Sequence, residues 1–316
     1  MSQVCLRTGG RRGVRSAPRG PDGRRPGSTA TPSAPAPSYA PVAIGPHVHL
    51  LSVDLEPWAG RFRPDDALFL LDLFRRNGAT ATFFVLASVA REHPGLIRRI
   101  DAEGHEVASH GWTHRPLYDV TPDAFRKETA EAVALLADVL GKPVLGFRAP
   151  LFSVMPGTLW ALDVLLDLGI QYDSSVFPFR GRRYGFPGFP RQAVRVSRGD
   201  RSIVEVPLST VRRGGMTLPA SGGGYFRLLP YALIRRALRA VNAEGRPLVV
   251  YCHPYEFGRR PLRCPRGYEG LGFWQRRLLE TKANLFRSTM RPKLERLLDQ
   301  FRFCSFQEAL RDEITR

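Results

Sequence analysis

The chain has 316 residues, 43% of them hydrophobic, and 47 basic against 29 acidic residues give it a net charge of +18. This length and composition suit one large domain. No apolar run approaches the roughly 20 residues of a membrane-spanning helix, so none is predicted. The four cysteines lack Cys-x-x-Cys spacing, which argues against a zinc finger or a disulfide framework and favours a reducing, cytoplasmic setting.

The N-terminal segment differs in composition from the rest of the chain. Residues 1–46 hold seven arginines and one acidic residue, Asp22, and are rich in Gly, Pro, Ser and Ala without hydrophobic periodicity. We therefore predict a disordered, dispensable tail over residues 1–45. It lacks the apolar core of a secretory signal peptide, while an organellar transit peptide and an upstream start-codon artefact are the alternatives.

The remaining positive charge is spread over the rest of the chain. Seven arginines less one aspartate account for +6 in the tail, which leaves +12 of the +18. This excess favours an anionic partner, such as a diphospho-lipid-linked sugar, an acidic polymer or a membrane surface on which the protein would be peripheral. A nucleic-acid partner is not predicted, because we find no recognition motif for one.

Beyond the tail, apolar strands alternate with amphipathic helices. Caps and breakers, such as Thr121 before Pro122 and Gly141 after Leu140, set the expected ends. The expected order is strand 47–56, helix 64–76, strand 79–86, helix 94–103, strand 106–108, helix 122–140, strand 146–148, helix 156–168, strand 202–208, helix 230–244 and strand 248–253. Such alternation predicts parallel β-α-β units in a partial or distorted (β/α) barrel of about seven strands.

We assign the barrel to residues 46–257 and the remaining residues, 258–316, to a C-terminal extension. The extension holds apolar residues at helical spacing, which predict helices packed on the barrel. These residues are Phe273, Trp274, Leu278, Leu279, Leu294, Leu297 and Leu298.

Two histidines four residues apart, His110 and His114, follow one of the short apolar strands. Two imidazoles on one turn can converge on a divalent metal ion, for which neutral imidazole is the commonest protein ligand. Alone, this spacing more often marks solvated or core histidines. The metal-site interpretation is supported by Asp54 and Glu56, which end an apolar strand and project to the same side. Their carboxylates repel each other unless a cation lies between them.

Polar residues also end two further apolar strands, Arg148 in one case and His253 in the other. Chemistry collects at the carboxyl ends of the strands in parallel α/β folds, so these strand ends predict a single site. Cys252, beside His253, is not expected to be a nucleophile, because a cysteine inside an apolar strand is usually a small buried hydrophobe.

The order Asp-x-Glu, His-x-x-x-His, Arg-x-Pro and a final apolar strand ending in His resembles the polysaccharide deacetylases (carbohydrate esterase family 4). The resemblance runs from about Val48 to Glu256. More narrowly, Ser52–Glu56, Tyr172–Pro178 and Tyr251–Phe257 look like a subfamily found beside exopolysaccharide and exosortase gene clusters. The resemblance implies a hydrolase that removes N-acetyl groups from an N-acetylated polysaccharide or lipid-linked sugar.

The resemblance also implies a role for each polar residue. The metal ligands would be Glu56, His110 and His114, holding Zn²⁺, with Co²⁺, Ni²⁺ or Mn²⁺ as alternatives. The catalytic residues would be Asp54 as general base, Arg148 as its partner, and His253 as general acid. Residues implied on the oxyanion or substrate side are Leu151, through its N–H, together with Asp173, Tyr255 and Glu256.

Two departures from the family pattern stand out: Leu55 separates acidic residues that are usually two adjacent aspartates, and Leu151 stands where an aromatic residue is usual. Two other functions stay open. One is a same-fold amidohydrolase acting on a small non-sugar amide, and the other is a catalytically inactive carbohydrate-binding barrel.

Two segments are rich in glycine. The aromatics of the loop 177–190 would either stack on sugar rings or pack on the rim of the barrel. Ser221–Phe226 lacks the Lys-Ser/Thr of a phosphate-binding loop, and we expect it to be a flexible turn near the site.

Overall fold

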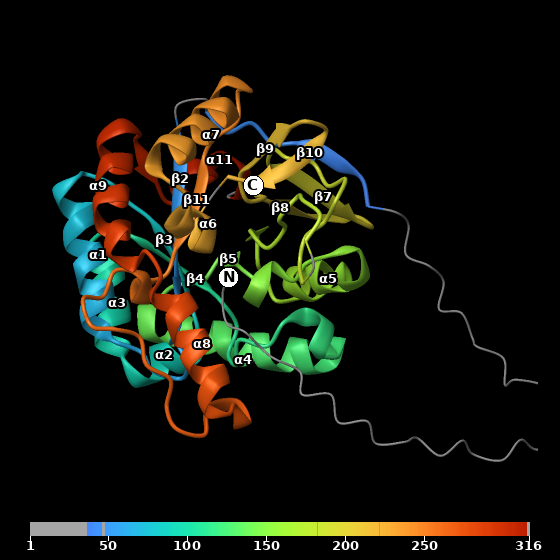
Figure 1. Cartoon of the computed structure of the whole chain (residues 1–316). Helices are drawn as coiled ribbons and strands as arrows, with labels where there is room; N and C mark the ends of the chain where they lie inside the picture. The colour runs from blue at the N-terminus through green and yellow to red at the C-terminus, as the bar shows by residue number, and fades with distance from the viewer. Residues whose placement is uncertain (1–36, 46–47, 182, 221, 315–316) are drawn as a thin grey trace, which may run out of the picture.

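The computed structural model describes residues 37–45, 48–181, 183–220 and 222–314 (Figure 1). The disorder expected for residues 1–36 lies outside this range. Residues 39–41, which we had expected in the tail, form a strand, and Val42 and Ile44 are buried in the core behind it. The prediction of disorder is therefore wrong for these residues. Their backbone pairs with another strand and two of their apolar side chains are buried, although the composition of the whole segment is typical of disorder.

A sheet of ten strands is the centre of the fold. Seven of them are parallel neighbours, as predicted. In spatial order these are β11 (Val249–Cys252), β2 (His49–Leu55), β3 (Thr82–Val85), β4 (Glu106–Ser109), β5 (Gly146–Phe147), β6 (Tyr172–Asp173) and β8 (Arg201–Glu205). Among the described strands no pairing joins β11 to the far end of the sheet, which fits a partial rather than a closed barrel.

Three further strands belong to the same sheet. β7 (Val194–Arg198) pairs antiparallel with β8, and β1 (Tyr39–Pro41) pairs antiparallel with β7, so the far end of the sheet is mixed. β12 (Phe303–Cys304) adds to β2. A separate hairpin consists of β9 (Thr210–Arg213) and β10 (Met216–Pro219).

Helices pack on the sheet and connect its strands (Figure 1). They are α1 (Pro64–Arg76), α2 (Ala87–Glu92), α3 (Pro94–Ala102), α4 (Pro122–Leu140), α5 (Trp160–Asp167), α6 (Gly223–Leu228), α7 (Tyr231–Ala243), α8 (Phe273–Asn284), α9 (Met290–Gln300), α10 (Phe306–Ala309) and α11 (Arg311–Ile314). Short 3-10 turns complete the chain: η1 (Leu117–Asp119), η2 (Pro150–Phe152), η3 (Pro156–Thr158), η4 (Pro254–Glu256), η5 (Tyr268–Gly270) and η6 (Arg287–Thr289).

Helix caps explain why α4 lies where the sequence places it. The Thr121 hydroxyl accepts a hydrogen bond from the N–H of Ala124 at 3.3 Å, and Pro122 occupies the first turn. Gly141 ends the helix with a φ of 68°, which glycine adopts without steric cost. The single helix expected over 156–168 is instead split into η3 and α5.

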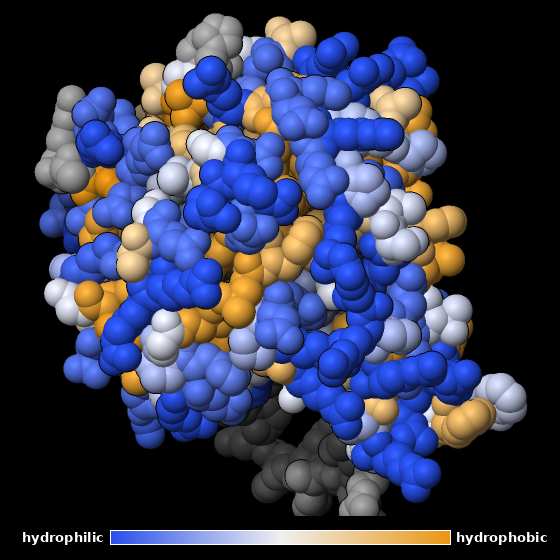
Figure 2. Space-filling view, turned by 90° about the vertical axis from the view of Figure 1, so that its left-hand side faces the viewer, coloured by the Kyte–Doolittle hydropathy of each residue, from blue (hydrophilic) through white to orange (hydrophobic). Residues whose placement is uncertain are grey.

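Strand β2 is buried along its whole length because β11 and β3 flank it on either side. Its apolar residues pack into hydrophobic clusters on both faces of the sheet, which explains their continuous run in the sequence. Helices α1 and α9 lie on the left of Figure 1. Figure 2 shows this side of the molecule, where hydrophilic side chains cover most of the surface and hydrophobic ones gather in a band across its middle.

The turn expected at Ser221–Phe226 is largely helical, since α6 begins at Gly223. A Cβ on Gly222 would lie 2.1 Å from the carbonyl oxygen of Tyr251, and one on Gly223 would lie 2.4 Å from its phenolic oxygen. The glycines therefore let α6 approach β11 closely. The expectation of a flexible turn did not include this close packing.

The extension also departs from expectation. Leu294, Leu297 and Leu298 of α9 are buried in the core. Phe273, Trp274 and Leu278 of α8 are not, and are 59%, 80% and 53% exposed. The prediction that these three pack on the barrel is wrong, because α8 buries its opposite face, Leu279 and Ala283.

Candidate metal centre

The parallel strands bring the predicted polar residues to one edge of the sheet. Asp54 lies near the end of β2, Glu56 follows this strand, and His110, Arg148 and His253 directly follow β4, β5 and β11. All five side chains are buried. The carboxyl ends of these strands therefore meet at one site, as the sequence predicted.

Glu56, His110 and His114 form a cluster that could hold a metal ion, with ligand atoms all within 4.8 Å of one another. His110 Nε2 lies 3.5 Å from Glu56 Oε2, and His114 Nε2 contacts the same oxygen. Both carboxylate oxygens of Glu56 are buried, and neither accepts a hydrogen bond. Buried carboxylates are costly without a partner, so two imidazoles and an unsatisfied carboxylate fit a divalent cation.

The orientation of His110 supports this fit. Its Nδ1 lies 2.7 Å from the carbonyl oxygen of Arg148, and a carbonyl can only accept. Nδ1 therefore carries the proton and Nε2 presents a lone pair toward Glu56, the arrangement usual for a metal-binding imidazole. His114 has a φ of 59°, a left-handed conformation that non-glycine residues adopt at a cost and often at functional sites.

The imidazoles also determine the charge of Glu56. Burial alone would raise the pKa of this carboxyl, but His114 and His110 beside it hold the pKa well below its ordinary value. Glu56 is therefore ionised and available as a ligand.

Arg148 is fully buried and every nitrogen of its guanidinium has a partner. Nη1 donates to Asp54 Oδ1 at 2.7 Å and to Ser52 Oγ at 2.8 Å. Nε donates to the carbonyl oxygen of Ser174 at 2.9 Å, and Nη2 donates to its hydroxyl at 2.9 Å. The guanidinium also lies 4.0 Å from the ring centre of Phe84. These contacts fix Asp54 and balance its charge.

His253 lies among three carboxylates. Its Nε2 is 3.9 Å from Asp54 Oδ2 and 3.7 Å from Glu56 Oε1, while its Nδ1 is 3.2 Å from Glu256 Oε2. The ring of Tyr255 stacks on it at 4.8 Å. Burial lowers the pKa of His253, but the hydrogen bond and charge of Glu256 outweigh this effect and raise the pKa. His253 can therefore carry a proton beside Asp54.

Two predicted residues lie less directly at the site. Leu151 is half-buried in η2, with a φ of 56°. Asp173 accepts a hydrogen bond from the hydroxyl of Ser175 at 2.5 Å, and this hydroxyl accepts one from the N–H of Ala149 at 2.6 Å. Asp173 thus supports the backbone that leads into Leu151, and its partners are Ser175 and Glu205 rather than the metal cluster.

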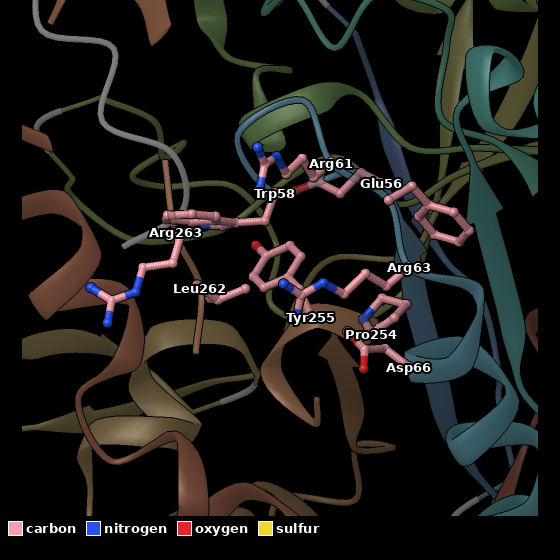
Figure 3. Close-up of a pocket in the computed structure, with 10 residues that line it drawn as sticks. Glu56, Trp58, Arg61, Arg63, Asp66, Pro254, Tyr255, Leu262 and Arg263 are labelled. Carbon is pink, nitrogen blue, oxygen red and sulfur yellow. The ribbon is translucent and has the colours of Figure 1, made fainter. Parts of the chain in front are cut away.

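Several residues around the candidate metal site were not predicted from the sequence. Ser52 and Ser174 receive hydrogen bonds from Arg148, and the signal was a small polar residue inside each apolar motif. A pocket beside Glu56 is lined by Trp58, Arg61 and Tyr255 among others. Figure 3 shows the side chains of Trp58 and Tyr255 in its lining, where they belong to one hydrophobic cluster. Trp58 and Arg61 belong to a loop after Pro57 in which no motif was evident.

The sequence left two roles open for the aromatic residues of the loop 177–190, stacking on sugar rings or packing on the barrel. Phe177 and Phe179 are buried, Phe177 packs on Phe152 at 5.6 Å between ring centres, and Tyr184 stacks on Phe177 at 6.1 Å. These aromatics pack on the protein rather than project from it.

Cys252 is buried in the core, and burial raises the pKa of its thiol well above the ordinary value, so it is not a reactive thiolate.

Comparison with known proteins identifies the family. Residues 50–172 match the family model described as polysaccharide deacetylase. This segment of the chain belongs to the polysaccharide deacetylase family. Residues 174–311 match a second model, described as a domain of unknown function (DUF3473). Because β8 and β11 of this second segment pair within the same sheet, the two matched segments together build the site, and His253 comes from the second.

Relatives with a named activity match the chain over part of their length. A chitin deacetylase of Pestalotiopsis sp. is 33% identical over 103 residues, which is 32% of this chain and 34% of that protein. A peptidoglycan-N-acetylglucosamine deacetylase of Bacillus cereus is 34% identical over 88 residues, 28% of this chain and 32% of that protein. The chain thus spans about a third of the length of these two relatives.

Solved structures share the fold at low sequence identity. A polysaccharide deacetylase family protein of Mycobacterium smegmatis has a TM-score of 0.59 and 18% identity, over 87% of this chain and 93% of that one. The allantoinase PuuE has a TM-score of 0.55 and 14% identity, over 82% and 87%. Both show the distorted (β/α) barrel architecture and nothing more specific. No helix in the described part of the chain is long and apolar enough to cross a membrane.

Proposed function

We propose that the protein is a metal-dependent hydrolase that removes N-acetyl groups from an N-acetylated sugar of an exported polysaccharide. The observation that carries this proposal is the buried Glu56 carboxylate, which accepts no hydrogen bond and lies against His110 and His114. Named relatives support the reaction class, since they are described as deacetylases of chitin and of peptidoglycan. The resemblance of the motifs to an exopolysaccharide-associated subfamily supports the substrate class.

In this proposal Glu56, His110 and His114 hold the metal, with Zn²⁺ the first candidate and Co²⁺, Ni²⁺ and Mn²⁺ the alternatives. A bound divalent cation would lower the pKa of a coordinated water toward about 7 and polarise the amide carbonyl. All three ligands come from the protein, which leaves coordination positions open for water and substrate. Both oxygens of Glu56 are available to it.

The remaining steps belong to residues around the metal ligands. Asp54, held by Arg148, takes the proton that the attacking water loses. The N–H of Leu151 stabilises the oxyanion that forms on the former carbonyl, an effect worth about 3–4 kcal/mol for one donor. His253, charged through Glu256, gives its proton to the amine as the carbon–nitrogen bond breaks. The products are acetate and a free amino sugar.

The experiment measures metal content and acetate release from N-acetylglucosamine oligomers for the full-length protein. We expect near-stoichiometric metal and acetate release in the wild type and loss of both in His110→Ala. His93→Ala serves as a matched control, because it removes a half-buried histidine outside the cluster. Metal binding without acetate release would favour the small-amide alternative, and absence of metal from the wild type under every loading condition would overturn the proposal.

A further inference from the structure

Helix α8 has two apolar faces, only one of which packs on the protein. Leu279 and Ala283 contact the cluster that contains Trp58, Tyr255 and Leu262. Trp274 and Leu278, one helical turn apart, lie roughly on the opposite face. They are among the most exposed large apolar side chains in the described part of the chain, at 80% and 53%. A face of this kind is costly in water unless another surface covers it.

The apolar face continues beyond the helix. Leu285 follows the last helical residue and is 45% exposed, and Phe286 beside it is 52% exposed. Phe273, at the start of the helix, contacts Trp274 edge to face at 5.1 Å between ring centres. Five large apolar side chains therefore lie exposed on α8 and the two residues after it, although these residue types are usually buried.

Basic residues are frequent in the segment that carries this apolar face. Residues 258–289 contain eight of them, Arg259, Arg260, Arg263, Arg266, Arg276, Arg277, Lys282 and Arg287, against two acidic residues, Glu269 and Glu280. The difference is +6. Glu280 is largely engaged, since it receives contacts from Arg263 at 3.2 Å and Arg277 at 3.1 Å. The field around α8 is therefore positive.

We propose that α8 docks on the surface of an anionic phospholipid bilayer, with Trp274 and Leu278 entering the headgroup region. Lys282 and exposed arginines of this segment, such as Arg259 and Arg266, would then face lipid phosphates, whereas Arg287 is buried. Bulky apolar side chains within a basic surface are the composition of interfacial helices, whose binding combines apolar burial with attraction to anionic lipid. A bilayer covers such a face without needing a complementary shape. A second copy of this chain fits less well, because both copies would bring the same positive charge.

Helix α8 lies between the proposed docking surface and the pocket beside Glu56. Its buried face packs on Trp58 and Tyr255, which line the pocket beside Glu56 (Figure 3). In Figure 1, α8 protrudes at the front of the molecule, away from the sheet. The bilayer and the pocket would therefore lie on opposite sides of one helix, which keeps the site close to a membrane-held substrate. Docking itself does not depend on the proposed hydrolysis, and it is tested without substrate.

The test uses the full-length protein and sedimentation with two kinds of vesicle, phosphatidylcholine alone and phosphatidylcholine mixed with phosphatidylglycerol. We expect binding to the anionic vesicles and a loss of at least about tenfold in affinity for the double variant Trp274→Ser/Leu278→Ser, since each buried apolar group contributes to interfacial binding. Leu233→Ser on α7 is the matched control: it is 49% exposed and lies outside this face, so its binding should be unchanged. The N-terminal segment is the same in all proteins.

A second measurement separates insertion from simple charge attraction. Trp274 is far more exposed than the other three tryptophans, so the emission of the wild type should shift to the blue on anionic vesicles, and Trp274→Phe should abolish the shift. Equal binding by the wild type and the double variant would overturn the proposal, as would a lack of binding to any vesicle. Self-association that the same substitutions abolish would assign the face to a second copy instead. Unchanged acetate release from soluble oligomers would show that a binding defect is separate from the active site.

Discussion

Arg148 Nη1 lies 2.7 Å from Asp54 Oδ1 in a place that water does not reach, with the two side chains 0% and 4% exposed. A buried carboxylate that loses its arginine partner is left poorly compensated, which costs about 3–5 kcal/mol. We therefore expect Arg148→Met to lower the free energy of unfolding by about this amount, as measured by urea denaturation, and to abolish acetate release. Arg126→Met is the control. It breaks an exposed pair with Asp167 and should leave the unfolding curve nearly unchanged. Similar effects of the two variants would contradict the role given to Arg148.

The two acidic residues at the end of β2 should differ in function although they are two positions apart. Glu56→Gln removes a proposed ligand, so added Zn²⁺ should no longer raise the melting temperature. In the wild type the stabilisation grows with metal concentration and reaches about 2.7 kcal/mol at a hundredfold excess over Kd. Asp54→Asn should keep the metal-dependent stabilisation and lose acetate release, because Asp54 is proposed to move a proton. Loss of metal binding in both variants would instead make Asp54 a ligand.

The buried carboxyls Asp173 and Glu205 predict a dependence of stability on pH. Burial raises the pKa of both in the folded state, and each is next to the other. Asp173 Oδ2 and Glu205 Oε2 accept no hydrogen bond from a donor, which fits one proton shared between them. A carboxyl with a raised pKa in the folded state stabilises the protein at low pH, and this contribution is lost as pH rises from the unfolded pKa to the folded one.

The variant that tests this pair is Glu205→Gln. An amide donates a permanent hydrogen bond to Asp173, while its oxygen can still accept from the N–H of Val176, as Glu205 does at 2.9 Å. We expect the variant to be more stable than the wild type at pH 8, with a smaller difference at pH 5, in urea denaturation. Glu92→Gln, on an exposed position, should show no such difference. A Glu205→Gln protein that is less stable at both pH values would exclude a shared proton.

The candidate site was largely predictable from sequence because most of its residues lie at the end of an apolar strand. Asp54, Arg148 and His253 needed only the rule that parallel strands end at one edge. The partners of Arg148 were not predictable, since Ser52 and Ser174 are small polar residues whose importance depends on a guanidinium from a distant strand. Pairing between distant segments is a tertiary effect that local pattern does not encode.

The C-terminal extension shows the same limit for the fold. The helical spacing of its apolar residues predicted helices, and α8 and α9 are present. The spacing did not say which apolar face would be buried, because Leu278 and Leu279 are adjacent and equally apolar. Packing against Trp58 and Tyr255 decided in favour of Leu279 and left Leu278 in solvent.

Leu151 offers a test of a backbone role. Its φ of 56° and ψ of 25° lie in the left-handed region, which costs a non-glycine residue about 1–2 kcal/mol. Leu151→Gly removes this strain and keeps the N–H, while it loses the contacts of a half-buried side chain and gives the unfolded chain more freedom. These effects oppose each other, so we expect a change in unfolding free energy below about 1 kcal/mol, together with substantial acetate release. If the N–H is the functional group, Leu151→Ala should behave like Leu151→Gly, apart from the strain it retains. A loss of acetate release in both variants as complete as in Arg148→Met would show that the side chain, rather than the N–H, does the work at this position.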